Sequence, residues 1–241
     1  MVLVSLFTFE ENLKEKDILR LKWKRKGKIW VTPRKSRYED QEFFLQFFSK
    51  QTLDDFLKNV DDESIREFMS LFKNNGESVI KRILCFVNTR KKILEVYRRC
   101  EEGDEIIDFV SEELRITPKK MRISPSSLIE ICRLSRRVRS ASFLRKDKIM
   151  ISLEGNNLKE NSLFLDFVSK MGKNMVSITA EPTIKFIGKR YCVGFDSRNS
   201  TISFPTDNLF IYTPRFEVRQ VVSLIHKLNY SPHTPDTPPH V

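Results

Sequence analysis

The sequence predicts an α+β protein: an N-terminal β-hairpin and a central helical bundle, followed by a mixed β-sheet with two helices. Three observations lead to this fold class. The first 37 residues resemble strands, and apolar and basic side chains alternate over residues 18–24, as in a half-buried strand. Residues 41–114 repeat apolar side chains at helical spacing, and residues 149–212 alternate again. With 40% hydrophobic residues, including 19 Phe, the 241-residue chain can bury a core.

The first region, residues 1–38, is expected to be a basic β-hairpin. Residues 1–9 are predicted to form a first strand. Residues 18–24 alternate apolar with basic side chains, and residues 29–31 return as a second strand after a turn that contains Gly27. The tip of this hairpin therefore carries mainly lysine and arginine.

Residues 39–114 are predicted to form the helical bundle. Phe43, Phe44, Phe47 and Phe48 recur at the spacing of a wide aromatic stripe on a helix. Amphipathic segments separated by short gaps are typical of helices that cover one another. The predicted helices after this stripe cover residues 53–57, 65–72, 79–87, 93–97 and 106–110.

The rest of the chain divides into three predicted regions. Residues 115–148 form a basic connecting segment with one short helix at 126–134. Residues 149–230 form an α+β C-terminal domain, and residues 231–241 form a Pro-rich tail without apolar periodicity, expected to be disordered. The C-terminal domain is predicted to contain strands at 149–153, 176–179, 183–187, 191–195 and 201–204, and helices at 161–171 and 214–228.

Cysteine usage and hydropathy indicate where the protein works. Cys85, Cys100, Cys132 and Cys192 are far apart and form no CxxC pair, which favours buried thiols in a reducing compartment. No apolar run approaches the length of a membrane span, and residues 1–9 do not resemble a signal peptide. We therefore expect no membrane partner and a nuclear or cytoplasmic location.

The net charge of +11 is concentrated in two segments. Residues 14–37 and residues 115–148 each carry eleven Lys or Arg against two acids, whereas residues 38–114 are net acidic. Such segregation favours contact with a polyanion, although long basic side chains also simply solvate surfaces. The predicted nucleic-acid-binding residues are Lys22, Lys24, Arg25, Lys26, Lys28, Arg34 and Lys35 in the first segment, and Lys119, Lys120, Arg133, Arg136, Arg137 and Arg139 in the second.

Seven of the ten prolines follow a serine or threonine. Ser124 and Thr213 fit helix N-caps followed by proline at the first helical position. Thr32 and Thr117 lie in the two basic segments, and each is followed by proline and two basic residues, the pattern that proline-directed kinases read. A phosphate there would add about −1.5 to −2 charges to a cationic segment. The predicted phosphorylation sites are Thr32, Thr117, Ser231, Thr234 and Thr237.

Two further features of the basic segments allow more than one interpretation. Trp23 and Trp30 could stack on bases beside cations, but strand alternation predicts that at least one of them lies in the core. Residues 133–142 could be a nuclear-import patch, a phosphate-binding arm or a basophilic kinase site at Ser140 or Ser142.

Catalytic patterns are weak. All three histidines lie in the last 16 residues, and no phosphate-binding loop or zinc-protease motif occurs. Asp166, Glu181 and Lys185 are the residue types of a metal-dependent nuclease, but Glu181 and Lys185 do not have the spacing of a shared strand face. We expect no catalytic residues, no metal and no cofactor.

The sequence therefore favours a non-catalytic nuclear adaptor, associated with nucleic acid or chromatin and with protein partners, and regulated by a proline-directed kinase. A viral or mobile-element nucleoprotein that uses the same basic faces on RNA or DNA is the alternative. A metal-dependent enzyme acting on nucleic acid is the second alternative.

Overall fold

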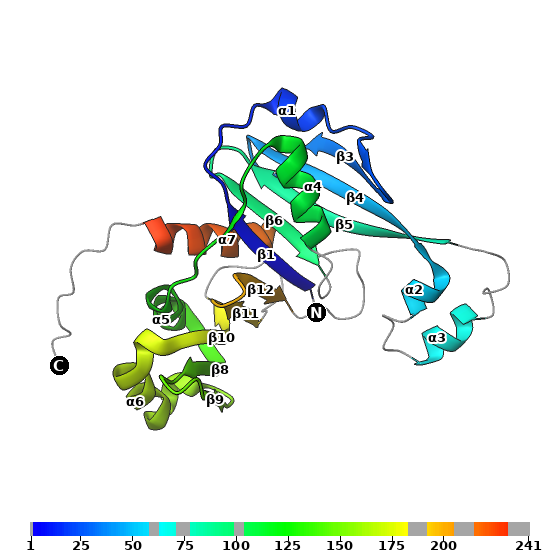
Figure 1. Cartoon of the computed structure of the whole chain (residues 1–241). Helices are drawn as coiled ribbons and strands as arrows, with labels where there is room; N and C mark the ends of the chain where they lie inside the picture. The colour runs from blue at the N-terminus through cyan, green and yellow to red at the C-terminus, as the bar shows by residue number, and fades with distance from the viewer. Residues whose placement is uncertain are drawn as a thin grey trace. The chain divides into compact units, whose positions relative to one another are not determined.

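The computed structural model describes residues 2–57, 63–70, 78–98, 104–182, 192–204 and 215–230. Twelve β-strands in these residues belong to antiparallel sheet structure, joined by short helices (Figure 1). The chain divides into two compact units, residues 7–119 and a second unit that combines residues 1–6 with residues 120–241.

The predicted fold class is wrong, because the described residues form mostly antiparallel sheet in place of a central helical bundle and a mixed sheet. The segments that carry most of its apolar residues are strands β4 (Glu42–Thr52), β5 (Ser78–Asn88) and β6 (Ile93–Arg98). The sequence 43–48 has large apolar side chains on both faces of a strand, so it also satisfies a helical repeat. The helix predictions at 53–57, 65–72 and 106–110 are confirmed by α2 (Leu53–Leu57), α3 (Glu63–Ser70) and α4 (Asp104–Leu114).

In the 7–119 unit, the strand order is β2-β3-β4-β5-β6, where β2 is Arg25–Lys26 and β3 is Ile29–Lys35. Phe43, Leu45 and Phe47 alternate onto the face covered by α4, and all three are buried. The ring of Phe109 on α4 meets Phe47 edge-on, with centroids 5.3 Å apart. The core of this unit therefore lies between α4 and one face of the sheet.

Residues 18–24 do not form the predicted first strand of the hairpin. They begin in α1 (Glu15–Leu19) and continue as turns, with Ile18 and Leu21 buried three residues apart. The short strand β2 replaces them as the partner of β3, and Gly27 turns the chain with a φ of 58°. That left-handed conformation suits glycine, which has no Cβ.

The second unit has the strand order β1-β12-β11-β10-β8-β9, and β7 (Lys119–Lys120) also pairs with β1 (Val2–Thr8). The other strands are β8 (Ser135–Leu144), β9 (Met150–Glu154), β10 (Met175–Pro182), β11 (Val193–Asp196) and β12 (Thr201–Phe204). The predicted strands at 1–9, 149–153, 176–179, 191–195 and 201–204 are thus confirmed, with shifted ends. Strand β8 was not predicted, and the strand prediction at 183–187 lies outside the described residues.

Helices cover the apolar face of this second sheet. Helix α5 (Pro125–Leu134) lies against β10, and Phe167 of α6 (Ser162–Met171) contacts Phe143 of β8 with ring centroids 5.6 Å apart. Short 3₁₀ helices at Leu158–Glu160 and Gly172–Asn174 flank α6, and α7 (Arg215–Tyr230) contacts α5. The predicted helices at 126–134, 161–171 and 214–228 are confirmed.

The N-cap prediction for Ser124 is also confirmed. Its hydroxyl accepts the backbone N–H of Ser127 at 3.0 Å, and Pro125 occupies the first helical position. The hydroxyl therefore satisfies one of the backbone donors left free at the start of a helix. Thr213 and the 231–241 tail lie outside the described residues.

Candidate nucleic-acid interface

The first basic cluster surrounds the β2–β3 hairpin, but three of its lysines already have acidic partners, including Lys35, which lies 3.5 Å from Glu15. Lys24 pairs with Glu113 of α4 at 2.9 Å, and Lys26 pairs with Glu112 at 2.6 Å. These ion pairs connect the hairpin to α4. Surface pairs contribute little stability, but they lower the positive charge that the two lysines offer to an outside anion.

The face of β3, β4 and β5 that points away from α4 carries both aromatic and cationic side chains. Residues directly opposite each other on paired strands point to the same face. Arg25, Trp30, Phe48 and Arg82 form one such row across four strands. Thr32 and Arg34 lie two and four positions after Trp30 on β3, so they point to the same face.

Ring contacts join the members of this face. Trp30 stacks on Phe48 with centroids 5.5 Å apart and an interplanar angle of 14°. The guanidinium of Arg25 lies 5.7 Å from the Trp30 ring centroid, and that of Arg34 lies 4.5 Å from the Phe44 centroid. Such cation–π contacts hold the arginines beside the rings. We call these five residues with Arg82 the aromatic–arginine face: Arg25, Trp30, Arg34, Phe44, Phe48 and Arg82.

The charge on the accessible part of this face is positive. Arg25, Arg34 and Arg82 are exposed, Trp30 and Phe48 are half-buried, and Phe44 is buried. None of the three arginines forms an ion pair with a residue that the structure describes. Glu95 shares the Arg34–Phe44 row but is only 4% exposed. Cations and aromatic rings can therefore meet a ligand without a competing exposed carboxylate in these rows.

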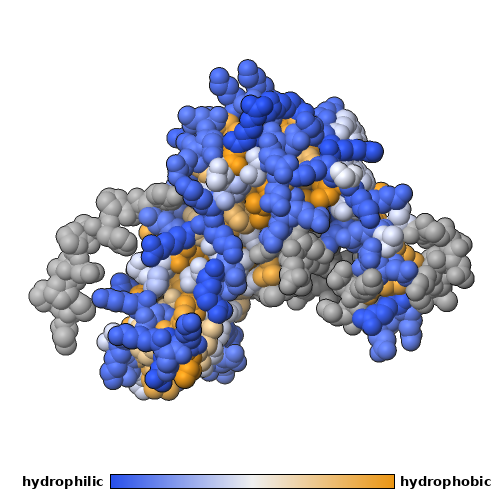
Figure 2. All heavy atoms as spheres, in the orientation of Figure 1, coloured by the Kyte–Doolittle hydropathy of each residue, from blue (hydrophilic) through white to orange (hydrophobic). Residues whose placement is uncertain are grey.

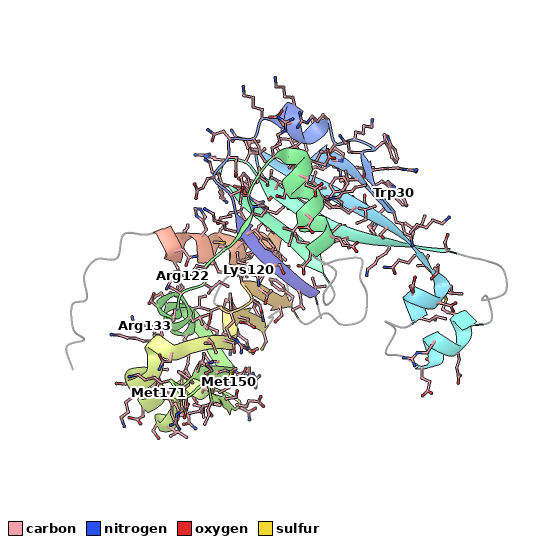
Figure 3. The ribbon with its side chains drawn as sticks, in the orientation of Figure 1. Trp30, Lys120, Arg122, Arg133, Met150 and Met171 are labelled. Atoms are coloured by element: carbon pink, nitrogen blue, oxygen red, sulfur yellow. The ribbon has the colours of Figure 1, made fainter. Side chains whose placement is uncertain are left out.

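Neither tryptophan lies in the core, so that part of the sequence interpretation is wrong. Trp23 is 64% exposed and has a left-handed backbone with a φ of 62°. Trp30, labelled in Figure 3, is half-buried. The core-facing residues of β3 are Ile29 and Val31 instead. Trp30 therefore lies partly exposed on the side of β3 opposite these core residues.

The second basic cluster belongs largely to the other unit. Lys120 and Arg122 lie on the segment that leads into α5, and Arg133 lies on α5 itself (Figure 3). Arg136, Arg137 and Arg139 follow on β8. The two predicted clusters therefore do not share one unit.

Several members of the second cluster have partners. Lys119 pairs with Glu10 at 2.9 Å, and Arg133 approaches Glu130 at 3.4 Å. Arg139 donates to the side-chain oxygen of Asn156 and lies 3.6 Å from Glu181. Among the described residues, Lys120, Arg136 and Arg137 have no ion pair, as is also true of Lys22 and Lys28 in the first cluster.

The aromatic partners of the first cluster were not predicted as site residues. Phe48 and Arg82 were assigned to helices, so nothing placed them opposite Trp30. The available signal was the alternation of Phe44, Gln46 and Phe48 with Phe43, Leu45 and Phe47, which gives one face apolar throughout and another of mixed character.

The residue types considered for a nuclease do not converge. Asp166 pairs with Lys170 on α6 at 2.8 Å, Glu181 lies on β10 beside Arg139, and Lys185 lies outside the described residues. In the part of the chain that the structure describes, no cluster of three or more His, Cys, Asp or Glu side chains is arranged to hold a metal ion. No helix in that part is long and apolar enough to cross a membrane.

No protein-family model matches this chain, and no curated protein matches it significantly. The functional argument therefore depends on the geometry of the chain's own residues. Hydrophilic side chains dominate the visible surface of the 7–119 unit (Figure 2). The candidate interface consists of the arginines and rings described above.

Two of the three described cysteines are buried. Cys85 and Cys132 are buried free thiols, and burial raises the pKa of Cys132 to about 12. Alkylation of native Cys132 by iodoacetamide near pH 8 is expected to be at least about 100-fold slower than in the urea-unfolded protein, because thiolate is the reacting form. Mass spectrometry of time points measures both rates, and equal rates would contradict a buried thiol.

Proposed function

We propose that this protein binds nucleic acid without catalysing a reaction on it, as a nuclear nucleic-acid- or chromatin-associated adaptor. The observation that carries the proposal is the aromatic–arginine face, where Arg25 and Arg34 lie over the rings of Trp30 and Phe44. The overall charge of +11 supports attraction to a polyanion. Regulation by a proline-directed kinase is part of the same proposal.

The mixture of rings and arginines favours single strands over duplexes. Bases stack on aromatic side chains and on guanidinium planes only when they are not already stacked in a helix. Trp30 and Phe48 offer such rings beside the exposed guanidiniums of Arg25 and Arg82, which can hold phosphates. Stacking tolerates any base, so we expect little sequence preference.

Trp30 provides a direct test because the chain contains only two tryptophans. In a Trp23→Phe variant, Trp30 is the sole indole fluorophore. Titration with oligothymidylate is expected to quench its emission, because a base stacks within the reach of the ring. The matched Trp30→Phe variant retains Trp23, whose emission is expected to change little.

Fluorescence anisotropy of a labelled oligonucleotide, measured in parallel, gives the affinity. Absence of binding at low salt would reject the proposed function. Binding without quenching of Trp30 would place the nucleic acid elsewhere on the protein and reject the aromatic–arginine face as its site.

A further inference from the structure

Thr117 has an exposed side chain and lies between α4 and β7, outside every helix and strand. It is followed by Pro118, Lys119 and Lys120, which matches the sequence pattern that proline-directed kinases recognise. A kinase binds its substrate as an extended chain, which suits the irregular backbone of Thr117 and Pro118, although Lys119 and Lys120 belong to β7 and pair with β1.

The other described Ser/Thr-Pro sites are less accessible. Thr32 lies inside β3, half-buried, with its backbone registered against Gln46 of β4. The hydroxyl of Ser124 is occupied as the N-cap of α5. Among these three sites, Thr117 alone combines an exposed side chain with irregular backbone.

Two acidic residues hold the Thr117 segment in place. The backbone N–H of Thr117 donates to the Glu11 carboxylate at 2.9 Å, and the Lys119 ammonium meets the Glu10 carboxylate at 2.9 Å. We call these two contacts the Glu10–Glu11 clamp. It joins residues near both ends of the 7–119 unit.

The charges of the clamp depend on each other. Hydrogen bonds from its own backbone N–H, and from the N–H and hydroxyl of Thr117, hold the pKa of Glu11 below its usual value despite some desolvation. The Glu10 carboxylate raises the pKa of Lys119. Both shifts favour the charged forms of Glu11 and Lys119 at neutral pH, and these charges surround a neutral threonine side chain.

We propose that Thr117 is a phosphorylation site and that its phosphate opens the Glu10–Glu11 clamp. The Thr117 hydroxyl attacks the γ-phosphorus of ATP: an O–P bond forms, the bond to the β-phosphate oxygen breaks, ADP leaves and the hydroxyl proton is released. The threonine that donated to Glu11 becomes a dianion beside it. Lys119 can then leave Glu10 for the phosphate.

This inference specifies the regulation contained in the proposed function, but its test uses no nucleic acid, so the two can fail separately. The protein is treated with a cyclin-dependent-type kinase and ATP, and the sites are mapped by mass spectrometry. Thr117 is expected to be modified faster than Thr32 or Ser124. Failure to modify Thr117 would overturn the proposal.

The opening of the clamp is tested by thermal unfolding. Loss of the clamp and repulsion between the phosphate and Glu11 are expected to lower the melting temperature by roughly 2 °C. A kinase-treated Thr117→Ala variant controls for phosphates at other sites and is expected to show no shift. In a Glu10→Gln, Glu11→Gln double variant, phosphorylation of Thr117 is expected to cause less than half the wild-type shift. An equal shift in the double variant, or none in the wild type, would overturn the proposal.

Discussion

Replacing Phe47 with alanine is expected to destabilise the 7–119 unit by about 3–5 kcal/mol, the usual cost of truncating a buried Phe. Its side chain is 1% exposed and meets the Phe109 ring of α4, so truncation leaves a cavity between helix and sheet. Urea unfolding followed by circular dichroism measures the change.

Phe48→Ala is the matched control. Phe48 is the adjacent residue, but it points to the opposite face of β4, where it is half-buried against Trp30. We expect a loss well below that of Phe47→Ala, because less of its surface is removed from water. Equal losses would contradict the strand, since a helical stripe would bury both rings alike.

Replacing Arg25, Arg34 and Arg82 together with glutamine is expected to lower the affinity for single-stranded nucleic acid by roughly 500-fold at about 50 mM salt. This figure follows if each arginine neutralises one phosphate, since a single-strand contact then contributes a factor of about eight at that salt relative to 1 M. The slope of log affinity against log salt should become less steep by about 2. Anisotropy titrations at four salt concentrations measure both quantities.

A Lys24→Gln, Lys26→Gln variant is the control for loss of charge alone. These lysines belong to the same basic segment but are paired with Glu113 and Glu112. Their replacement is expected to weaken binding far less than that of the arginines, although all five are basic residues of the same unit. If the lysine variant lost as much affinity per charge as the arginine variant, non-specific electrostatic attraction would explain binding, and the aromatic–arginine face would not be needed.

Much of the second unit could be predicted from the sequence because its local signals agree with one another. Ser124 before Pro125 marks the start of α5, and residues 196–200 turn the chain between β11 and β12, with Asp196 accepting the N–H groups of Arg198 and Asn199. Strand β8 was not predicted because its several arginines are typical of an exposed connecting segment. In the structure, Val138, Ala141 and Phe143 of this strand are buried.

The fold of the 7–119 unit could not be predicted in this way. A strand with apolar side chains on both faces, such as 43–48, has no period of two, and its many phenylalanines fit a helix equally well. The pairing of β4 with β5 joins residues more than 25 positions apart, and no local signal carries that register. The candidate site was consequently predicted only in part: the arginines of β2 and β3 were identified, whereas Phe48 and Arg82 required the register.

The pairing of β1 with β12 affects how the protein folds during synthesis. Val2 lies opposite Phe204, so β1 is synthesised about 200 residues before β12, although β7 also pairs with β1. At 5–20 residues per second, this delay is roughly 10–40 s. The intervening 7–119 unit can fold in the meantime, whereas an apolar strand with an open edge invites contact with other nascent chains. At high expression levels, the yield of folded protein should therefore depend on how well β1 is shielded from other nascent chains until translation is complete.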